Sequence, residues 1–560
     1  MPISSDKMKK NATPSYPKGN LWLLIVGFVV LASLPFLVPR LGFLSLIAFI
    51  PLFQLDRLLR EHQVRHAFWY FYAAFLGFNI ASTFWIWFVS AAGAIAAILL
   101  NALQMTAVVA IYRWGGRILR QLEKRPAAAD FISLIFLAVT WLAWEHIYFN
   151  IEISWPWLCL GNSFSTNPEM VQWYEWTGAV GGSAWILLCN ILLFLAISKR
   201  PGRGRRICRW SAAAVVVLPL LASEIRYATY KESEDPMEIV VIQPNIDPFE
   251  KYGVKPQSAY DARLIELMAR ETTSETRYIV TPETFTFSWD IDNPQDNASY
   301  QRYRAFLSAH PGTDLLLGAL TTRRYECSTK PTRSARPNGE GHWYDVYNTA
   351  LVMDSRQVYG SYVKSKLVPG VEIIPYEHVL KFLGPLVSRF GGSSTSYGTQ
   401  DEMDAIPCSD GRKLGAMICY ESVYGDWSRM ATKKGASFLA VMTNDGWWGD
   451  TPGYRQHFNY ARLRAIENRR DVVQAANTGT SGFINQRGDV LARTGWWEET
   501  TLRGTVNGND AQTFFVRHGD VTGRAACLTF FIQLVSLIIW KAAAASDKRS
   551  ARGKSASGNA

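Results

Sequence analysis

Long apolar segments are the feature that most limits how this 560-residue chain can fold. A helix that crosses a membrane needs about 20 predominantly apolar residues. Eight segments approach that length, seven of them before residue 225: 21–38, 42–55, 67–89, 92–112, 131–149, 183–198, 208–224 and 523–541. Two of these, 42–55 and 208–224, are marginal by length alone. The sequence therefore predicts a membrane protein with about eight spans and a long extramembrane block before the last one.

Lysine and arginine alternate between dense and nearly bare loops. The N-terminal tail and the loops after the second, fourth and sixth spans are basic, as in KRPGRGRRICR at 199–209, and the C-terminal tail is basic again. Since short basic loops stay in the cytoplasm, we expect both termini there and the intervening block on the outer, periplasmic face of a bacterial inner membrane. The first span is interpreted as an uncleaved signal anchor, because no small-residue cleavage site follows a short apolar region.

Composition excludes several classes of function. The net charge of +11 is spread over loops and is not gathered on one soluble face, so no nucleic-acid partner is expected. Seven cysteines in this length make no disulfide scaffold, and none has zinc-like spacing, so no metal is expected. No glycine-rich phosphate loop follows a strand, which argues against a nucleotide site. Glu145 and His146, near the end of the fifth predicted span, are either functional or hydrogen-bonded between helices.

Between residues 225 and 522 the pattern changes to short apolar runs that alternate with helical segments. Runs typical of strands include MEIVVIQPN (237–245), RYIVTPE (277–283), YNTALVMD (347–354) and GAMICYE (415–421). Strands with two apolar faces, interspersed with helices, are typical of a layered α/β domain. The sequence thus predicts three parts: a seven-span membrane domain at 1–224, an extramembrane α/β domain at 225–522, and a last span with a basic tail at 523–560.

Three chemically reactive residues share one placement in this block. Glu283 ends RYIVTPE, Cys419 ends GAMIC, and Lys364 follows a run that ends in YGSYV. The ends of neighbouring strands commonly meet at one edge of an α/β domain, so we expect the three side chains to lie together. Each also has a plain structural interpretation: a glutamate in a turn, a surface lysine and a buried cysteine.

The three residue types form a complete set for nucleophilic catalysis. A cysteine attacks as its thiolate, and its pKa falls beside a cation such as lysine. A desolvated carboxylate can take the thiol proton, and an ammonium group can stabilise the oxyanion of a tetrahedral intermediate. Order and spacing alone leave inert packing open for Cys419, since buried cysteines often act as small apolar side chains.

Longer motifs weigh against inert packing. TPE (281–283), KSKLVPGVEIIPYE (364–377) and ICYE (418–421) resemble motifs of the nitrilase, or carbon–nitrogen hydrolase, superfamily. With seven spans before this block and one after it, the whole chain resembles the apolipoprotein N-acyltransferase family, with further matching stretches at 155–165, 241–246, 443–457, 461–470 and 475–482. The resemblance implies a polytopic α-helical membrane domain of about eight spans joined to a nitrilase-like α-β-β-α sandwich.

Roles are carried over by position in these motifs. The resemblance implies Glu283 as general base, Lys364 as transition-state stabiliser and Cys419 as nucleophile. Glu372 matches a glutamate that supports the site. Lys366 stands where the family often has histidine, which makes it the weaker candidate for the catalytic lysine.

Other residues match the surroundings of such a site. Tyr420 and Glu421 match the pair after the nucleophile, and Tyr252 stands where the family has a tryptophan, so that an aromatic face is kept without the indole N–H. Trp447 and Trp448 lie in a glycine-flanked loop and are either packing residues or part of a lid that touches acyl chains.

Three polar residues of the last matching segments are interpreted as structural. His457 has the chemistry of a base, but the resemblance already gives that role to Glu283. Arg464 and Glu467 are spaced as neighbours on a helix, which predicts a salt bridge.

The implied reaction is a two-step acyl transfer that needs no cofactor. Cys419 takes an acyl chain from a phospholipid, expected to be phosphatidylethanolamine, and the α-amine of an apolipoprotein's diacylglyceryl-cysteine then attacks the thioester. The resemblance implies membrane lipids and apolipoproteins as partners and a monomer as the working unit. Cys327 and Cys408 are candidates for a disulfide that leaves Cys419 free. Two alternatives stay open: a membrane-tethered amidase that uses the same three residues, and a transporter or lipid-binding scaffold with a degenerate enzyme domain.

Overall fold

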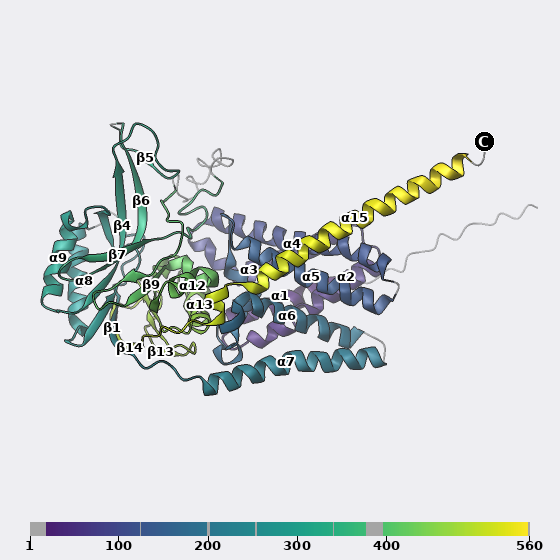
Figure 1. Cartoon of the computed structure of the whole chain (residues 1–560), viewed down its shortest axis with the longest axis horizontal. Helices are drawn as coiled ribbons and strands as arrows, with labels where there is room; N and C mark the ends of the chain where they lie inside the picture. Colours follow the sequence, from purple (N-terminus) through teal and green to yellow (C-terminus); the bar gives the residue numbers. More distant parts are fainter. Residues whose placement is uncertain are drawn as a thin grey trace, which may run out of the picture.

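The computed structural model describes residues 18–123, 125–198, 202–251, 255–339, 341–376 and 396–557. A bundle of long helices and an α/β domain with two sheets lie end to end along the longest axis (Figure 1). Within the described ranges, eight helical segments are long and apolar enough to cross a membrane, which confirms the number predicted from the sequence. Seven precede the α/β domain and one follows it.

The bundle contains the helices α1 (Lys18–Leu37), α2 (Ile50–Glu61), α3 (Ala67–Thr83), α4 (Ala91–Leu122), α5 (Pro126–Tyr148), α6 (Tyr174–Ser198), α7 (Arg203–Thr229) and α15 (Val521–Ser557). The short segment predicted at 42–55 is longer in the structure, because the 3₁₀ turn η1 (Gly42–Leu46) leads into α2 and the candidate span reaches Glu61. Pro51 lies in the first turn of α2, where its missing N–H removes no helical hydrogen bond.

Polar side chains inside the bundle bind one another or the backbone. Asn101 donates from Nδ2 to Oδ1 of Asn79 at 2.6 Å, and Asn190 accepts from the backbone N–H of Phe49 at 2.8 Å. Glu145 Oε1 accepts from the indole N–H of Trp141 at 3.1 Å. Trp141 and Glu145 both lie in α5, and Glu145 Oε1 also accepts from the Leu160 N–H, outside that helix, at 3.1 Å. Hydrogen bonding inside the bundle therefore accounts for these groups.

Two mixed sheets form the α/β domain. The first has the order β14-β1-β2-β4-β6-β5, with β3 on β4 and β7 on β6, and the second has the order β13-β12-β11-β10-β9-β8. The first sheet comprises β1 (Pro236–Gln243), β2 (Thr276–Val280), β3 (Thr286–Asp290), β4 (Asp314–Tyr325), β5 (Arg336–Pro337), β6 (Trp343–Met353), β7 (Val358–Val363) and β14 (Thr500–Asn507). The second comprises β8 (Ile406–Pro407), β9 (Lys413–Ile418), β10 (Ala436–Thr443), β11 (Val472–Ala476), β12 (Gly482–Ile484) and β13 (Val490–Arg493).

Each sheet carries helices on its outer face, as the predicted α-β-β-α order requires. Side chains such as Val241 from the first sheet and Val441 from the second fill the space between the sheets. Helices α8 (Gln257–Glu271) and α9 (Ala298–Ser308) cover the first sheet, and α12 (Gly425–Lys433) and α13 (Pro452–Asn468) lie on the side of the second sheet that faces the bundle (Figure 1). The fold class predicted from the sequence is confirmed.

Helix α13 is buried on both sides because it lies between the second sheet and the bundle. Phe458 and Ala461 pack with the strands, whereas Tyr460, Leu463 and Ile466 pack with the core of the bundle. The layer of the α/β domain that carries α13 is therefore continuous with the apolar core of the bundle.

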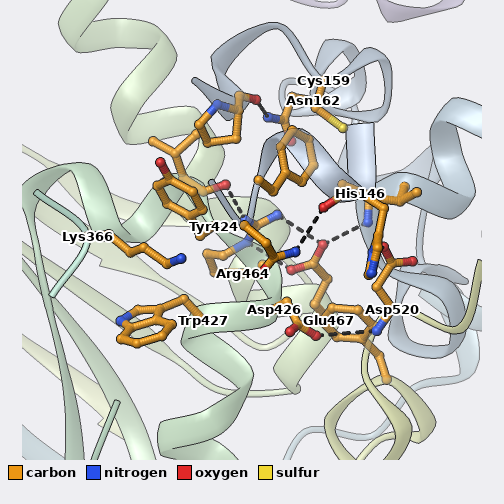
Figure 2. A pocket seen from close by; sticks show the side chains of 18 residues that line it. His146, Cys159, Asn162, Lys366, Tyr424, Asp426, Trp427, Arg464, Glu467 and Asp520 are labelled. Atoms are coloured by element: carbon orange, nitrogen blue, oxygen red, sulfur yellow. Dashed lines mark hydrogen bonds and ion pairs between the residues drawn. The ribbon is translucent and has the colours of Figure 1, made fainter. Parts of the chain in front are cut away.

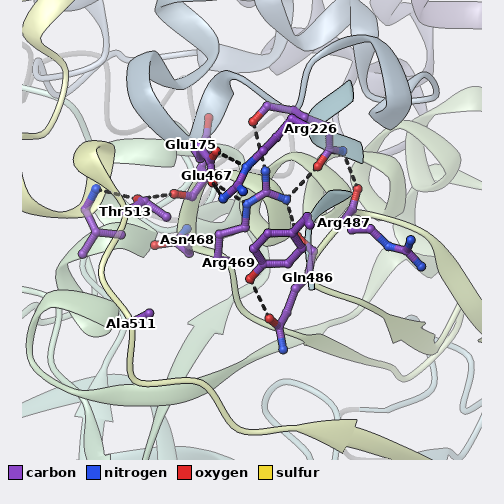
Figure 3. Close-up of polar contacts among 12 residues, drawn as sticks. Glu175, Arg226, Glu467, Asn468, Arg469, Gln486, Arg487, Ala511 and Thr513 are labelled. Carbon is purple, nitrogen blue, oxygen red and sulfur yellow. Dashed lines mark hydrogen bonds and ion pairs between the residues drawn. The ribbon is translucent and has the colours of Figure 1, made fainter. Parts of the chain in front are cut away.

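A buried polar cluster, here called the junction cluster, ties the end of α13 to α6 and α7 (Figure 3). Arg469 ends α13 in the left-handed conformation, with φ of 50°, and donates from Nε to Glu175 Oε2 at 2.7 Å. Arg226 donates from Nε to the other oxygen of Glu175 at 2.6 Å, and Arg469 also reaches Gln172 Oε1 at 2.6 Å. The two parts of the molecule are thus joined by ion pairs as well as by apolar packing.

Candidate active site

Three strands of the two sheets position the reactive residues predicted from the sequence. Lys364 and Cys419 come directly after β7 and β9, and Glu283 lies in a turn three residues after β2. The Lys364 ammonium donates to Glu283 Oε1 at 2.9 Å, and the charges of both groups act on the Cys419 thiol. The structure therefore brings these three side chains together.

The turn that carries Glu283 has an unusual backbone. Thr284 adopts a φ of +47°, a region that residues other than glycine seldom occupy. Gly318 of β4 lies so close that a Cβ there would be 2.2 Å from the Pro282 carbonyl oxygen. Buried Lys251 donates from Nζ to the Glu283 carbonyl at 2.9 Å and to Thr284 Oγ1 at 3.2 Å. These contacts hold the turn in the conformation that presents the carboxylate.

Cys419 sits on a sharp turn between β9 and the 3₁₀ segment η8 (Cys419–Val423), with a φ of +52°. The Glu421 carboxylate holds this turn, because its Oε2 accepts from the Ile418 N–H at 3.0 Å. Its Oε1 accepts from the N–H groups of Ser365 and Lys366 at 2.8 and 3.1 Å. Glu421 thereby links the cysteine turn to the segment that carries Lys364.

Lys364 lies between two carboxylates. Its ammonium donates to Glu283 Oε1 and to Glu372 Oε1, both at 2.9 Å, and its side chain is only 1% exposed. Asn348 of β6 donates from Nδ2 to Glu283 Oε1 at 2.7 Å. Glu372 is itself held, because its Oε2 accepts from the Val368 N–H at 2.9 Å. The sequence-predicted Glu372 is therefore part of the same buried ion cluster.

The two charged partners stabilise each other's ionised forms. Burial alone would raise the pKa of Glu283, but the charge and hydrogen bond of Lys364 outweigh burial and lower the pKa of that carboxyl. Burial alone would lower the pKa of Lys364, but the charges of Glu283 and Glu372 outweigh it and raise the pKa of the ammonium. At neutral pH the site holds a carboxylate and an ammonium side by side.

The pKa of Cys419 differs from the sequence prediction. Burial of the thiol and the negative charge of Glu283 raise its pKa well above the usual range, and the ammonium of Lys364 opposes this only in part. The ammonium of Lys364 acts in the direction that the sequence predicted, but desolvation dominates and the net shift of the Cys419 pKa is upward. The resting thiol keeps its proton, so its attack requires a base.

Two residues of this site were not predicted from the sequence: Lys251 and Asn348. Burial lowers the pKa of Lys251 to about 8, although the charge of Glu283 opposes the change. Lys251 stands in a polar loop after β1, and Asn348 stands within a strand-like run, so no local pattern marks either residue. Only the packing of β1, β2 and β6 in one sheet brings them to Glu283.

The remaining predicted residues that the structure describes contact either the bundle or the α/β domain. Tyr420 donates from its hydroxyl to the Ser154 carbonyl at 2.7 Å and stacks on Trp155, both in the loop between α5 and α6. Trp448 packs against Trp85, with ring centroids 4.9 Å apart. Trp447 packs on Phe249 at 5.0 Å. Tyr252 lies outside the described residues.

Three other polar residues have the structural surroundings expected of them. His457 is fully buried between Asp445, whose Oδ1 lies 3.0 Å from Nδ1, and the Cys419 carbonyl, which lies 3.0 Å from Nε2. Arg464 and Glu467 form a buried salt bridge at 2.8 Å, as predicted. His457 thus contacts the backbone of the nucleophile turn.

The suggested disulfide between Cys327 and Cys408 is absent, and all seven cysteines, which lie within the described ranges, are free. Cys408 lies near Asp314 at the start of β4, whereas Cys327 follows the other end of that 12-residue strand. At about 3.3 Å per residue, the strand separates them by roughly 36 Å, far beyond the reach of a disulfide. Within the described ranges, no group of three histidine, cysteine, aspartate or glutamate side chains is arranged to hold a metal ion.

Two family models match the chain. The carbon-nitrogen hydrolase model matches residues 241–514, and the model of the apolipoprotein N-acyltransferase N-terminal domain matches residues 27–192. A relative named apolipoprotein N-acyltransferase from Chlorobaculum tepidum is 28% identical over 496 residues, which cover 85% of this chain and 88% of that one. A relative of the same name from Geobacter metallireducens is 28% identical over 71% of this chain and 73% of that one.

The chain belongs to the apolipoprotein N-acyltransferase family. The N-terminal match begins in α1 and ends in α6, and the second match begins in β1 and ends at the start of α14 (Phe514–His518). Among solved structures, a crystal structure of Saccharomyces cerevisiae Nit3, a member of the nitrilase superfamily, matches with a TM-score of 0.37 and 15% identity, over 53% of this chain and 98% of that one. The two family models and the named relatives confirm the resemblance to the apolipoprotein N-acyltransferase family noted in the sequence.

Proposed function

We propose that this protein transfers an acyl chain from a phospholipid, through a thioester on Cys419, to the α-amine of the N-terminal diacylglyceryl-cysteine of an apolipoprotein. The observation that carries the proposal is the Cys419 thiol on a left-handed turn beside the buried Glu283–Lys364 ion pair. Membership of the apolipoprotein N-acyltransferase family supplies the substrate class. The inferred roles are base for Glu283, oxyanion stabiliser for Lys364 and nucleophile for Cys419.

In the first half-reaction the thiol sulfur attacks the ester carbonyl of the phospholipid, and Glu283 takes the thiol proton. Lys364 stabilises the negative oxygen of the tetrahedral intermediate. The intermediate expels the lipid alkoxide, which recovers the proton from Glu283. The products are a lysophospholipid and an acyl thioester on Cys419.

In the second half-reaction the free amine of the diacylglyceryl-cysteine attacks the thioester. Glu283 takes a proton from the attacking nitrogen, and Lys364 again stabilises the oxyanion. Collapse of the intermediate forms the amide and expels the Cys419 sulfur, which recovers the proton. The enzyme returns to its starting state, and the chemistry consumes no cofactor.

Both substrates are anchored in lipid, which fits the packing of the nucleophile turn against the bundle. Tyr420, the residue after the nucleophile, is held by the loop between α5 and α6. We propose that this loop lies at the outer surface of a bacterial inner membrane, that the α/β domain is periplasmic, and that both termini are cytoplasmic. The C-terminal end of α15 lies at the end of the bundle away from the α/β domain (Figure 1), which agrees with this orientation. The division at 224/225 and 522/523, phosphatidylethanolamine as donor and a monomeric working unit are parts of the same proposal.

A membrane-tethered amidase would use the same three residues on a soluble substrate. It predicts hydrolysis of small amides without lipid, and nothing in the family comparisons favours it over acyl transfer. The two functions differ in the fate of the acyl-enzyme, which an amidase passes to water and an acyltransferase passes to an amine.

The test is an intact-mass measurement on the detergent-purified protein after incubation with phosphatidylethanolamine, beside a Cys419→Ala control. We expect a mass gain of one acyl chain that hydroxylamine removes and that the control lacks. A diacylated lipopeptide added afterwards should return the enzyme to its starting mass and gain the chain itself. Absence of the adduct together with hydrolysis of small amides would overturn the proposal in favour of the amidase.

A further inference from the structure

A cavity lies where the α/β domain meets the outer ends of α5, α6 and α15, and it contains none of the residues Glu283, Lys364 and Cys419 (Figure 2). Its membrane side is formed by residues that include Phe149, Val180 and Phe515. Its other side is formed by the segment after η8 and by a lysine from the segment after β7. The residues labelled in the view are His146, Cys159, Asn162, Lys366, Tyr424, Asp426, Trp427, Arg464, Glu467 and Asp520.

Most of the charged side chains around this cavity already have a partner of opposite charge. Glu467 pairs with Arg464 at 2.8 Å, and Asp520 pairs with His146 at 2.7 Å. Asp426 pairs with Arg429, just outside the lining, at 2.5 Å. Lys366 differs, because no carboxylate in the described part of the chain lies within 4 Å of its ammonium. Lys366 is therefore the cation of the lining that has no ion-pair partner among the described residues, although the charges of Glu421 and Asp426 act on it.

The Lys366 ammonium is held between two aromatic faces. It lies 5.2 Å from the ring centre of Tyr424 and 5.0 Å from that of Trp427. Both rings are fixed, since Tyr424 Oη lies 2.8 Å from Ser154 Oγ and Trp427 Nε1 donates to Tyr362 Oη at 3.0 Å. Ring faces attract an ammonium but accept none of its three N–H groups in the manner of an oxygen. Burial lowers the pKa of Lys366, while the charges of Glu421 and Asp426 oppose the change.

The size of the cavity limits what it can hold. Its volume is about 60 Å³, and a water molecule needs about 10–15 Å³ by this measure. The cavity has room for roughly four to six water molecules, which is enough for a phosphate group.

The position of the cavity points to the source of such a phosphate. The lining includes Phe149, the first residue after α5, and Asp520, the last residue before α15. At the ends of spanning helices the surroundings change from hydrocarbon to lipid headgroups. The lining combines apolar side chains with a cation, and a phospholipid carries the matching groups, apolar chains and an anionic phosphate.

We propose that this cavity binds the phosphate of a phospholipid headgroup, with the Lys366 ammonium as its ligand. The bound lipid is distinct from the acyl donor, because the cavity does not include the nucleophile. It fills the junction of α5, α12 and α15 and so stabilises the contact between the α/β domain and the bundle. The inference depends on membrane embedding and not on acyl transfer.

The experiment is native mass spectrometry of the full chain in the Cys419→Ala background, titrated with phosphatidylethanolamine. This background prevents a covalent acyl adduct from being counted as bound lipid. We expect the first lipid adduct to weaken about tenfold in Lys366→Met, since a hydrogen bond to a charged group is lost, and to persist in Lys366→Arg. Lys413→Met, at an exposed lysine on β9, is the matched control and should bind as the parent does.

Three outcomes are decisive. Equal lipid affinity in the parent and Lys366→Met overturns the proposal, and so does inorganic phosphate that displaces the lipid adduct at millimolar concentration, because the site would then be one for free anions. Loss of lipid in Lys366→Met with retention in Lys366→Arg supports it. Lys366→Arg keeps the positive charge. If this variant retains lipid while Lys366→Met loses it, the loss is due to the missing headgroup ligand and not to general misfolding. Failure of the acyl-transfer proposal changes none of these outcomes.

Discussion

Two buried ion clusters in this molecule each pair a glutamate with cations, but they serve different purposes. In the junction cluster, both oxygens of Glu175 are occupied, by Arg226 and Arg469 at 2.6 to 3.1 Å. The second cluster, here called the site cluster, contains Glu283, Lys364, Glu372 and Asn348. In it Glu283 accepts from Lys364 and Asn348 through Oε1, and no hydrogen bond to its Oε2 is found among the described residues. A carboxylate with a free oxygen can still receive a proton, whereas a saturated one can only hold its partners in place.

The first prediction tests this comparison by removing the carboxylate that acts as the base in the site cluster. Glu283→Gln keeps an oxygen for Lys364 but has no carboxylate to take the thiol proton. We expect thioester formation to slow by about 10²–10⁴-fold, measured as the single-turnover rate of acylation by phosphatidylethanolamine. An acylation rate within threefold of the parent would mean that another group is the base.

The sequence predicts the helical bundle, the α/β domain and the candidate site to different extents. Spans were predictable because length and apolar content alone determine them, and Glu283, Lys364 and Cys419 were found because strand ends carry local motifs. The roles of Glu372 and Glu421 were inferred from the resemblance, and their hydrogen bonds now give a physical reason for those roles. Lys251, Asn348 and the junction cluster were not predicted, because they arise from strands and helices packed together from distant parts of the chain. The raised pKa of Cys419 was also missed, since desolvation depends on tertiary burial.

The second prediction addresses the junction cluster, where stability should change and chemistry should not. Glu175→Gln leaves the buried Arg469 and the partly exposed Arg226 without their carboxylate, which should destabilise the protein by about 3–5 kcal/mol. Thermal unfolding in detergent measures the loss, and the acylation rate below the unfolding temperature should stay within threefold of the parent.

The matched control is Glu232→Gln. It breaks a partly exposed pair with Arg487 and should cost about 0–1 kcal/mol. Equal unfolding temperatures for the two variants would contradict the assignment of Glu175 as a structural anchor.

The third prediction concerns Lys251, the cation that contacts the backbone carbonyl of Glu283. The charge of Lys251 helps to keep the pKa of Glu283 low, so activity is present above that pKa and is lost as pH falls through it. Lys251→Met removes the charge and should move this acid limb to higher pH by about one unit. The pH dependence of single-turnover acylation measures the shift, with exposed Lys255→Met as the control. If the acid limb of the pH profile does not shift in Lys251→Met, then Lys251 supports only the backbone of the Glu283 turn.

The smallest effect should be seen in the resting thiol. Because burial raises the pKa of Cys419, it should be a thiol at pH 7 and react with iodoacetamide at least about tenfold more slowly than Cys327 in the same protein. The rate at Cys419 should rise as pH increases towards its raised pKa. Faster labelling of Cys419 than of Cys327 at neutral pH would indicate a preformed thiolate and remove the need for Glu283 as base.

The most direct test of the account is to locate the acyl chain. The acyl-enzyme formed with phosphatidylethanolamine is digested under mildly acidic conditions, which preserve thioesters, and the peptides are sequenced by tandem mass spectrometry. The account predicts one acyl group, on the peptide that contains Cys419, with the other six cysteines unmodified. An acyl group on any other residue, or none on Cys419 while the lipopeptide is still acylated, would contradict it.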